Sequence, residues 1–155
     1  MDPETTLELR AAFKAFDSDN SQSVPILTGA DGVFCTGNGL KVAAGGHTAA
    51  GGLELALWYN LQVASATAVF GVYYRRWGAP LNDGGTIRLP RLISHNRALN
   101  NTLTSRGGEV TELSDIGLAN RLDPAGKALP TATELALEIV KFSQRCLKAD
   151  RRSSY

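Results

Sequence analysis

The segment that most constrains the fold is HTAAGGLELALWYN, residues 47–60, because it places one ionisable side chain in a run suited to burial. Eight of the ten residues from Gly51 to Asn60 are glycine, aliphatic or aromatic, and Glu54 is the single charged residue among them. The run that follows the two glycines predicts a helix buried on all sides, over residues 53–60. Glu54 must therefore find hydrogen-bonding or charged partners inside the fold, because burial removes its water.

Two roles for Glu54 are consistent with these residues. Loss of hydration disfavours the charged form of a buried carboxylate, which suits such a group to general acid–base chemistry near neutral pH. A helix that begins near Gly51 also leaves its first N–H groups without intrahelical acceptors, and these donors favour an oxyanion. Alternatively, Glu54 has a structural role and pairs with a core arginine, for which the candidates are Arg75, Arg76 and Arg88. The sequence leaves both roles open.

The length and composition are those of one ordinary globular domain. The 155 residues include 16 basic and 15 acidic side chains, and 43% of all residues are hydrophobic. The net charge of +1 gives no electrostatic basis for a nucleic-acid partner, and the longest apolar run is too short to span a membrane. We therefore predict neither interaction. Cys35 and Cys146 form no CxxC motif, and the first residues are polar, which together predict a cytoplasmic location.

The pattern of apolar residues predicts an α/β chain in which short strands alternate with helices. Strands are expected at residues 24–29, 33–35, 61–64 and 68–71, and again after Gly117. Helices are expected around residues 9–16, 53–60, 94–105 (with Ser94 as N-cap) and 110–116, together with a short one that starts near residue 84 and ends before Pro90.

The clearest helix is expected at the C-terminal end. Thr131 and Glu134 match the T-x-x-E pattern of a capping box. The apolar residues that follow are spaced by 4, 3 and 4 positions, which predicts one buried stripe made of Leu135, Ile139, Phe142 and Cys146. Cys146 is accordingly expected in the core.

Other motifs are less specific. The GNGLKV turn lacks the third glycine of a dinucleotide fingerprint. His47 and His95 have no metal-ligand spacing with the cysteines, so we predict no metal. His47 is expected to be hydrogen-bonded in a turn, with contact to a substrate as the alternative. The aromatic residues Tyr73, Tyr74 and Trp77 either line an acyl pocket or cap the core, and the sequence does not decide between them.

Four segments together resemble a known family: ILTGADGVFCTGNGLK, GGHTAAGGLELALWYNLQVA, FGVYYRRWGAPLNDGGTIRLPRLI and DIGLANRL. They are similar to the hallmark motifs of the crotonase superfamily, the enoyl-CoA hydratases and isomerases, over about residues 7–155. The resemblance implies a reduced crotonase-like ββα spiral with short strands and a C-terminal helix. It also implies a single shortened domain over residues 1–155, in which the family's first strand pair, central helical insert and last helices are reduced or missing.

The resemblance further implies an acyl-CoA thioester as substrate and no separate cofactor. In the family, two backbone N–H groups form an oxyanion hole that stabilises the thioester enolate, and the motifs place these donors at Asn38 and Gly51. Glu54 matches the first catalytic glutamate. Tyr74 stands where hydratases carry a second glutamate, and Asp83 precedes GGT where the dienoyl-CoA isomerase branch carries an aspartate. We expect Asp83 or Tyr74 to assist Glu54.

We further expect substrate contacts from Thr36, Gly37 and Leu40 of the glycine-rich turn, and from Trp77. The implied activity is that of a lyase or isomerase of fatty acid metabolism, and a homo-oligomer is compatible with it. The alternative is a non-catalytic binding or scaffold domain that keeps the crotonase-like core with a degraded active site, because the second glutamate is absent. The sequence leaves this alternative open.

Overall fold

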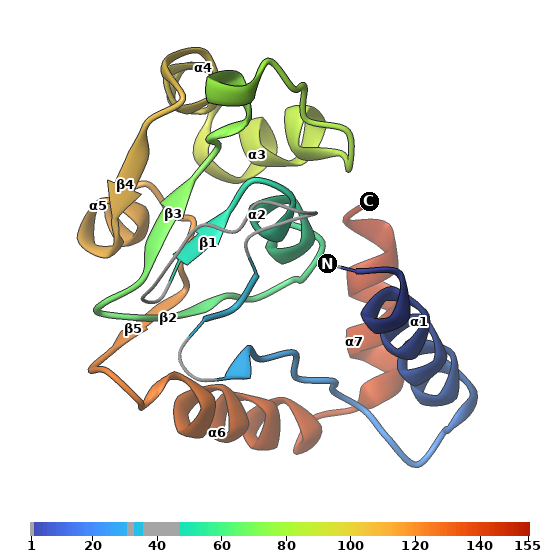
Figure 1. The fold of residues 1–155 in the computed structure, drawn as a ribbon. Coiled ribbons are helices and arrows are strands. Elements are labelled where there is room, and N and C mark those ends of the chain that lie inside the picture. The colour runs from blue at the N-terminus through green and yellow to red at the C-terminus, as the bar shows by residue number, and fades with distance from the viewer. Residues whose placement is uncertain (1, 31–32, 36–46) are drawn as a thin grey trace.

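The computed structural model describes residues 2–30, 33–35 and 47–155 (Figure 1). The described residues form helices and short strands, in agreement with the predicted α/β class. The helices are α1 (Pro3–Ser18), α2 (Gly51–Ala56), α3 (Gly85–Ile93), α4 (His95–Thr104), α5 (Val110–Asp115), α6 (Ala128–Val140) and α7 (Gln144–Ser153), with a 3₁₀ turn η2 (Tyr74–Trp77). The strands are β1 (His47–Ala49), β2 (Val63–Ser65), β3 (Val69–Gly71), β4 (Gly107–Glu109) and β5 (Arg121–Asp123).

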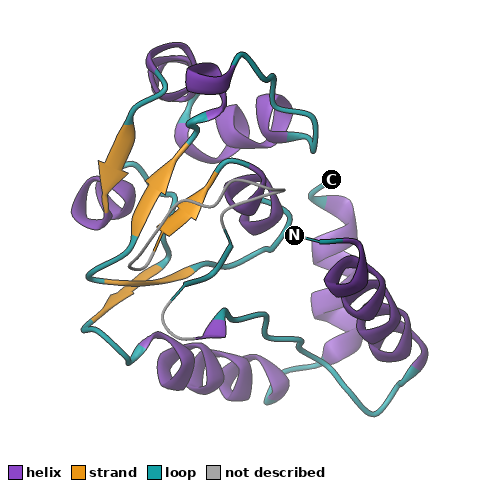
Figure 2. Cartoon of the chain, in the orientation of Figure 1, coloured by secondary structure: helices purple, strands orange, loops and turns teal. Residues whose placement is uncertain are grey.

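The strands form two small sheets that lie among the helices (Figure 2). In the first sheet the order is β1-β3-β4: β1 runs parallel to β3, and β4 runs antiparallel to it with Phe70 opposite Gly108. In the second sheet β2 pairs in parallel with β5, with Ala64 opposite Leu122. The strands predicted near 61–64 and 68–71 and after Gly117 are thus confirmed, whereas β4 was not predicted.

One hydrophobic core joins α2, α3 and β3. Leu53 and Leu57 lie on one side of it, and Leu89 and Ile93 lie on another, each 3% exposed or less. Full burial of such side chains stabilises a fold by roughly 1.5–3 kcal/mol each. The residues that flank Glu54 in the chain are therefore fixed by packing, which fixes the direction of its side chain.

Helix α3 continues through Pro90, so the prediction that it ends before this proline is wrong. A proline inside a helix removes one backbone hydrogen bond and costs about 3 kcal/mol. Leu89 and Ile93 lie on either side of Pro90 and are 1% and 2% exposed. Burial of Ile93 offsets much of this cost, because its side chain would leave the core if the helix stopped at residue 89.

The single C-terminal helix predicted from Thr131 to Cys146 is wrong, because the chain forms α6 and α7 with a break at residues 141–143. Gln144 stabilises the break: its side-chain amide donates hydrogen bonds to the carbonyl oxygens of Ile139 and Phe142 at 3.1 and 3.0 Å. Phe142 is 64% exposed and Cys146 is exposed, so neither belongs to the core. Lys127, not Thr131, precedes the helix.

Three other local predictions are corrected. Residues 24–29 form no strand, and of residues 33–35 only Cys35 pairs, in an isolated bridge to Thr48. The helix predicted over residues 53–60 ends at Ala56, and Trp58 beyond it is 51% exposed. Ser94 does precede α4, but its side chain makes no capping hydrogen bond. Helices α1 and α5 agree with prediction, and Gly117 ends α5 with a φ of 83°.

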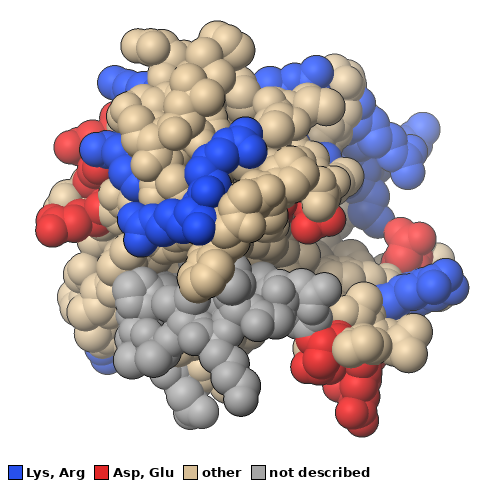
Figure 3. Space-filling view, turned by 45° about the horizontal axis from the view of Figure 1, so that its top comes forward, with Lys and Arg blue, Asp and Glu red and all other residues tan. Residues whose placement is uncertain are grey.

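Acidic and basic side chains are interspersed on the face shown in Figure 3. This distribution accords with the net charge of +1. Within the described residues, no helix combines the length and the apolar character that crossing a membrane would require.

Candidate functional site

Glu54 is the centre of the candidate site. It lies in the first turn of α2 and is 1% exposed. The helix starts sharply, because Ala50 just before it has φ 50° and ψ −124°, a conformation that L-residues rarely adopt. The backbone N–H of Ala50 donates to the Gly71 carbonyl oxygen at 2.9 Å, which ties the start of α2 to β3. The strained turn therefore directs Glu54 into the interior.

Among the described residues, three hydrogen-bond donors and no cation bind the Glu54 carboxylate. The backbone N–H groups of Asp83 and Gly85 donate to Oε1 at 3.0 and 2.8 Å. The Tyr74 hydroxyl donates to Oε2 at 2.7 Å. A carboxylate offers about four acceptor positions, and the three donors within the described residues occupy all but one of them, on Oε2. These donors replace the water that the carboxylate loses on burial.

The alternative in which an arginine pairs with Glu54 is wrong for the described part of the chain. Arg75 and Arg76 are exposed. Arg88 instead stacks its guanidinium on the Trp58 ring, 3.6 Å from the centroid, and donates to the Leu57 carbonyl oxygen at 3.3 Å. The partners of Glu54 are a phenol and two backbone groups.

Glycine is required at position 85 because Glu54 lies directly against it. A Cβ atom on Gly85 would lie 2.7 Å from Glu54 Oε1 and 2.6 Å from a methyl carbon of Leu81. Real Cβ atoms do not approach neighbouring atoms this closely. The preceding Gly84 has a φ of 91°, a conformation that glycine adopts without strain. The GG pair of PLNDGGT thus shapes the turn that binds the carboxylate.

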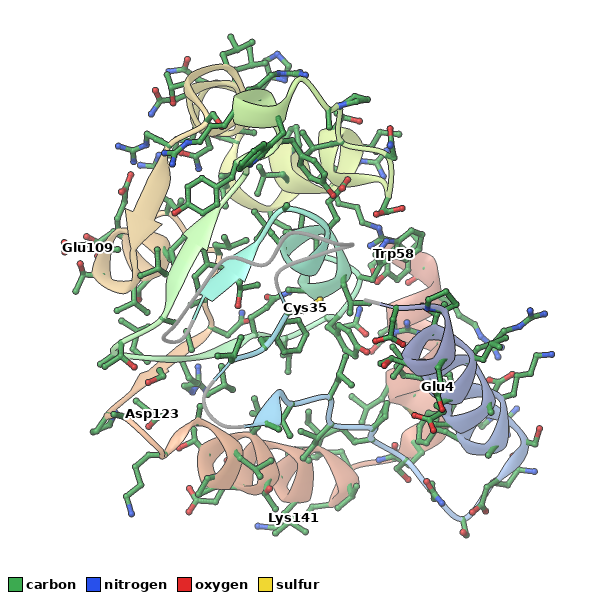
Figure 4. The ribbon with its side chains drawn as sticks, viewed as in Figure 1. Glu4, Cys35, Trp58, Glu109, Asp123 and Lys141 are labelled. Carbon is green, nitrogen blue, oxygen red and sulfur yellow. The ribbon has the colours of Figure 1, made fainter. Side chains whose placement is uncertain are left out.

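Gly52 is required for a different close approach. A Cβ atom there would lie 1.9 Å from the Cys35 carbonyl oxygen, so the first turn of α2 touches the Cys35 backbone directly. Figure 4 places Cys35 in the middle of the molecule beside α2. The missing Cβ of Gly52 is therefore required by packing of the chain against itself.

Tyr74 is a neutral phenol in this environment. Its pKa is raised above 10 by burial, with further contributions from the hydrogen bond to Glu54 and from the negative charges of Glu54 and Asp83. A raised pKa keeps the hydroxyl proton in place at neutral pH. Tyr74 therefore donates to Glu54 and is not itself a base.

The other two aromatic residues of this stretch behave differently. The Tyr73 ring fills the space above two glycines: Cβ atoms on Gly71 and Gly107 would lie 2.2 and 2.1 Å from its atoms. Trp77 is 65% exposed. Among the described residues, Tyr73 thus caps the sheet, whereas Tyr74 reaches Glu54.

The structure places the remaining predicted site residues as follows. Asp83 contributes its backbone N–H to Glu54, while its side chain is exposed. Gly51 begins α2 as expected. Four predicted residues lie outside the described part of the chain, namely Thr36, Gly37, Asn38 and Leu40. The backbone of His47 begins β1 instead of forming a turn.

Sequence reasoning missed the role of Trp58. Its indole N–H donates to the Asp83 carbonyl oxygen at 2.8 Å, and its ring lies against Gly84, where an added Cβ would meet it at 3.6 Å. Figure 4 shows Trp58 near the C-terminal end of α7. Trp58 and the stacked Arg88 thus hold the turn at residues 83–85 from outside. A tryptophan at the end of an apolar run is predicted to be buried in the core. The sequence therefore gave no indication of this contact.

Replacing Trp58 by phenylalanine tests this contact. The phenyl ring keeps an aromatic face but is smaller than the indole and lacks its N–H, so we expect the free energy of unfolding to fall by about 1 kcal/mol or more. Urea denaturation measures the change. Trp77→Phe is the matched control, because the Trp77 side chain is 65% exposed and makes no hydrogen bond within the described residues. Equal effects of the two substitutions would show that the Trp58 N–H does not hold the turn.

Comparison with known proteins identifies the family of the chain. A sequence profile of the family described as "Enoyl-CoA hydratase/isomerase" matches residues 42–153. The chain is 29% identical to enoyl-CoA hydratase EchA19 of Mycobacterium tuberculosis over 92% of this chain and 66% of that protein. It is 27% identical to a probable mitochondrial enoyl-CoA hydratase of Dictyostelium discoideum, over 88% of this chain and 60% of that protein. The chain therefore spans less than two thirds of the length of either relative.

Solved structures show the same fold. The crystal structure of an enoyl-CoA hydratase from Mycobacterium tuberculosis superposes with a TM-score of 0.87 at 30% identity, covering 95% of this chain and 72% of that one. An enoyl-CoA hydratase/isomerase structure from Mycobacterium abscessus gives a TM-score of 0.89 at 26% identity, covering 99% and 72%. These matches confirm the predicted fold class.

Proposed function

Since the chain belongs to the enoyl-CoA hydratase/isomerase family, we propose that it acts on an enoyl-CoA thioester with Glu54 as the group that transfers the proton. The observation that carries this proposal is the Glu54 carboxylate itself, which is 1% exposed and held by three donors from the part of the chain that the structure describes. A carboxylate fixed in this way needs no rearrangement to accept a proton, which is the advantage of a preorganised site.

Double-bond isomerisation requires one proton-transfer group. Glu54 removes a proton from a carbon of the acyl chain, the C–H electrons move into the thioester to form an enolate, and the protonated Glu54 returns the proton to a different carbon. Hydration uses the same carboxylate: Glu54 takes a proton from water as the water oxygen bonds to the β-carbon, and the protonated Glu54 then gives that proton to the α-carbon of the enolate. Both reactions develop negative charge on the thioester oxygen, which the site must stabilise.

In this proposal the backbone N–H groups of Gly51 and Asn38 bind that oxygen. Gly51 is the first residue of α2, so its N–H has no acceptor within the helix. The assignment of Asn38 rests on its place in the CTGNG motif. Thr36, Gly37, Leu40 and Trp77 are proposed to contact the thioester and its acyl chain.

Tyr74 and Asp83 have supporting roles in the proposal. Tyr74 fixes Oε2 of Glu54 through its hydroxyl and stays protonated. The Asp83 side chain is exposed, while its backbone N–H donates to Glu54 Oε1, so this residue lies between the carboxylate and solvent. We propose that Asp83 exchanges protons between the site and water.

A second candidate function is a non-catalytic scaffold or binding domain. The observation that favours it is the same burial, because a carboxylate that bonds Tyr74, Asp83 and Gly85 also joins α2 to η2 and α3. In this role Glu54 is a structural link, and acyl-CoA binding is weak or absent.

The two functions differ in turnover. We expect the protein to consume crotonyl-CoA, which is measured as a loss of the absorbance of the conjugated thioester. If the protein is an isomerase, we expect it to produce the same absorbance from a 3-enoyl-CoA. Glu54→Gln is the control for both assays. If several enoyl-CoA chain lengths give no turnover and calorimetry detects no binding, the catalytic proposal fails and the scaffold proposal stands.

Tyr74→Phe is expected to lower the free energy of unfolding by about 2 kcal/mol, because it removes a donor from a buried carboxylate. Urea denaturation measures the loss. Tyr73→Phe is the control, since the Tyr73 hydroxyl makes no hydrogen bond within the described residues, and its effect is expected to stay within about 0.5 kcal/mol. A Tyr74→Phe protein as stable as wild type would contradict the proposed fixing of Oε2.

A further inference from the structure

Three side chains, here called the α7 clamp, join the end of helix α7 to the segment that follows α2. Asn60 accepts a hydrogen bond at Oδ1 from Arg151 Nε at 2.8 Å, and its Nδ2 donates to the Tyr155 hydroxyl oxygen at 2.7 Å. The two partners lie 91 and 95 positions further along the chain. Because an arginine only donates hydrogen bonds, the Asn60 oxygen must face Arg151. The α7 clamp is therefore a specific tertiary contact.

The α7 clamp reaches the residues that hold the turn at 83–85. The Tyr155 ring lies beside two guanidinium groups, with the central carbon of Arg151 5.6 Å and that of Arg88 5.9 Å from its centroid. Cations within about 6 Å of an aromatic ring are attracted to it. Arg88 also stacks on Trp58 at 3.6 Å, and the Trp58 indole donates to the Asp83 carbonyl oxygen. Arg88 thus links the end of α7 to Trp58, which lies close to it in Figure 4.

This chain of contacts acts on Glu54 through the backbone. The turn supplies two of the three donors that the described residues offer the carboxylate, at 3.0 and 2.8 Å. A hydrogen bond weakens steeply when its donor turns away, so a small movement of the turn changes how Oε1 is bound. Trp58 and Tyr155 are 51% and 68% exposed, so each ring contact alone contributes little. Together they restrict the turn from outside.

We propose that the end of α7 positions Glu54 through the turn at residues 83–85. The α7 clamp holds Arg88 against Trp58, and this pair keeps the N–H groups of the turn directed at the carboxylate. The members of the clamp act through the turn and not on the reacting atoms, so they are positioning residues. Their effect on turnover rests on the proposed function, whereas their effect on the order of the turn does not.

Arg151→Ala opens the α7 clamp, and Arg152→Ala is the matched control. Both substitutions remove one positive charge from the last turn of α7. Within the described residues, only the Arg151 side chain contacts Asn60 and the Tyr155 ring. A change that follows from the charge alone is therefore the same in both variants.

The first measurement is amide hydrogen exchange by NMR, which needs no substrate. We expect Arg151→Ala to speed exchange of the Gly85 N–H roughly 3–10-fold, because the donor to Glu54 opens more often. The Leu118 N–H, bonded elsewhere in the core at 2.8 Å, is expected to change less than about twofold. Equal acceleration at both amides, no acceleration at Gly85, or the same effect in Arg152→Ala would overturn the proposal.

The second measurement is the NMR signal of the Trp58 indole N–H. The chain has two tryptophans, and Trp77→Phe shows which signal belongs to Trp58. We expect Arg151→Ala to shift the Trp58 signal and to leave the Trp77 signal in place. A general loss of stability in a protein that stays folded moves neither signal. An unmoved Trp58 signal therefore contradicts the proposal.

Tyr155 provides a second pair of variants. Tyr155→Phe keeps the ring beside Arg88 and loses the hydrogen bond to Asn60, whereas Tyr155→Leu loses both contacts. We expect both to speed exchange of the Gly85 N–H, with the larger effect for Tyr155→Leu. Wild-type exchange in Tyr155→Leu would overturn the proposal even if Arg151→Ala does not fold.

Kinetics distinguishes failure of this proposal from failure of the proposed function. In a protein that turns over an enoyl-CoA, we expect Arg151→Ala to lower kcat roughly 3–10-fold and to change KM less than about twofold, because the α7 clamp acts on the proton-transfer group. A rise in KM with kcat unchanged would assign the clamp to substrate binding and overturn the proposal. If the wild type gives no turnover, the proposed function fails, and the exchange and indole measurements alone decide whether α7 positions Glu54.

Discussion

Glu54→Gln is expected to lower turnover of an enoyl-CoA substrate by roughly 10²–10⁴-fold while leaving the fold intact. The substitution is nearly isosteric. The glutamine Oε1 still accepts from the N–H groups of Asp83 and Gly85, and its Nε2 donates to the Tyr74 oxygen, which reverses that hydrogen bond. A neutral amide cannot accept a proton at any working pH, so catalysis is lost without a gap in the hydrogen-bond network.

The measurement combines steady-state kinetics with urea denaturation of the same preparations. We expect kcat to fall and the free energy of unfolding to change by less than about 1 kcal/mol. The Tyr74→Phe variant provides the contrast, because it weakens the network and keeps the carboxylate. If Glu54→Gln retains wild-type turnover, Glu54 does not transfer the proton. If it loses several kcal/mol of stability and no turnover is found in either protein, Glu54 is a structural link.

Gly52→Ala is expected to destabilise the protein by about 3 kcal/mol or more. The added Cβ would overlap the Cys35 carbonyl oxygen at 1.9 Å and its carbonyl carbon at 2.4 Å. Overpacking of this kind usually costs about 1–3 kcal/mol, and here the obstructing atoms are backbone, which cannot move aside as a flexible side chain can. The loss is large against a total stability of about 5–15 kcal/mol for a typical domain.

Thermal and urea unfolding of Gly52→Ala are compared with those of Gly108→Ala. An added Cβ on Gly108 meets the flexible end of Glu112 at 3.1 Å, so that side chain turns away. Replacing glycine by alanine within a strand otherwise stabilises by about 0.5–1 kcal/mol. The two substitutions therefore have opposite expected signs. A Gly52→Ala protein as stable as wild type would show that the start of α2 does not press on Cys35.

Local sequence signals predicted several elements well. The stripe of Leu9, Phe13 and Phe16 marked α1, and Gly117 marked the end of α5. Prediction was wrong where burial in the core or a side-chain hydrogen bond prevailed over the simplest local pattern. Burial of Ile93 carries α3 through Pro90, and the Gln144 amide stabilises a break where the apolar spacing indicated one continuous helix. The single shortened domain over residues 1–155 stays a prediction.

The sequence by itself determined that Glu54 is a lone carboxylate in a buried run after two glycines, and its motifs indicated the family. Only the tertiary structure decided what the carboxylate binds. Its partners Tyr74, Asp83 and Gly85 follow 20, 29 and 31 positions later in the chain. Two of the three contribute backbone N–H groups, which every residue except proline carries, so no residue type marks them in the sequence. The convergence of the three partners on one carboxylate depends on how η2 and α3 pack against α2, and packing is a property of the folded chain.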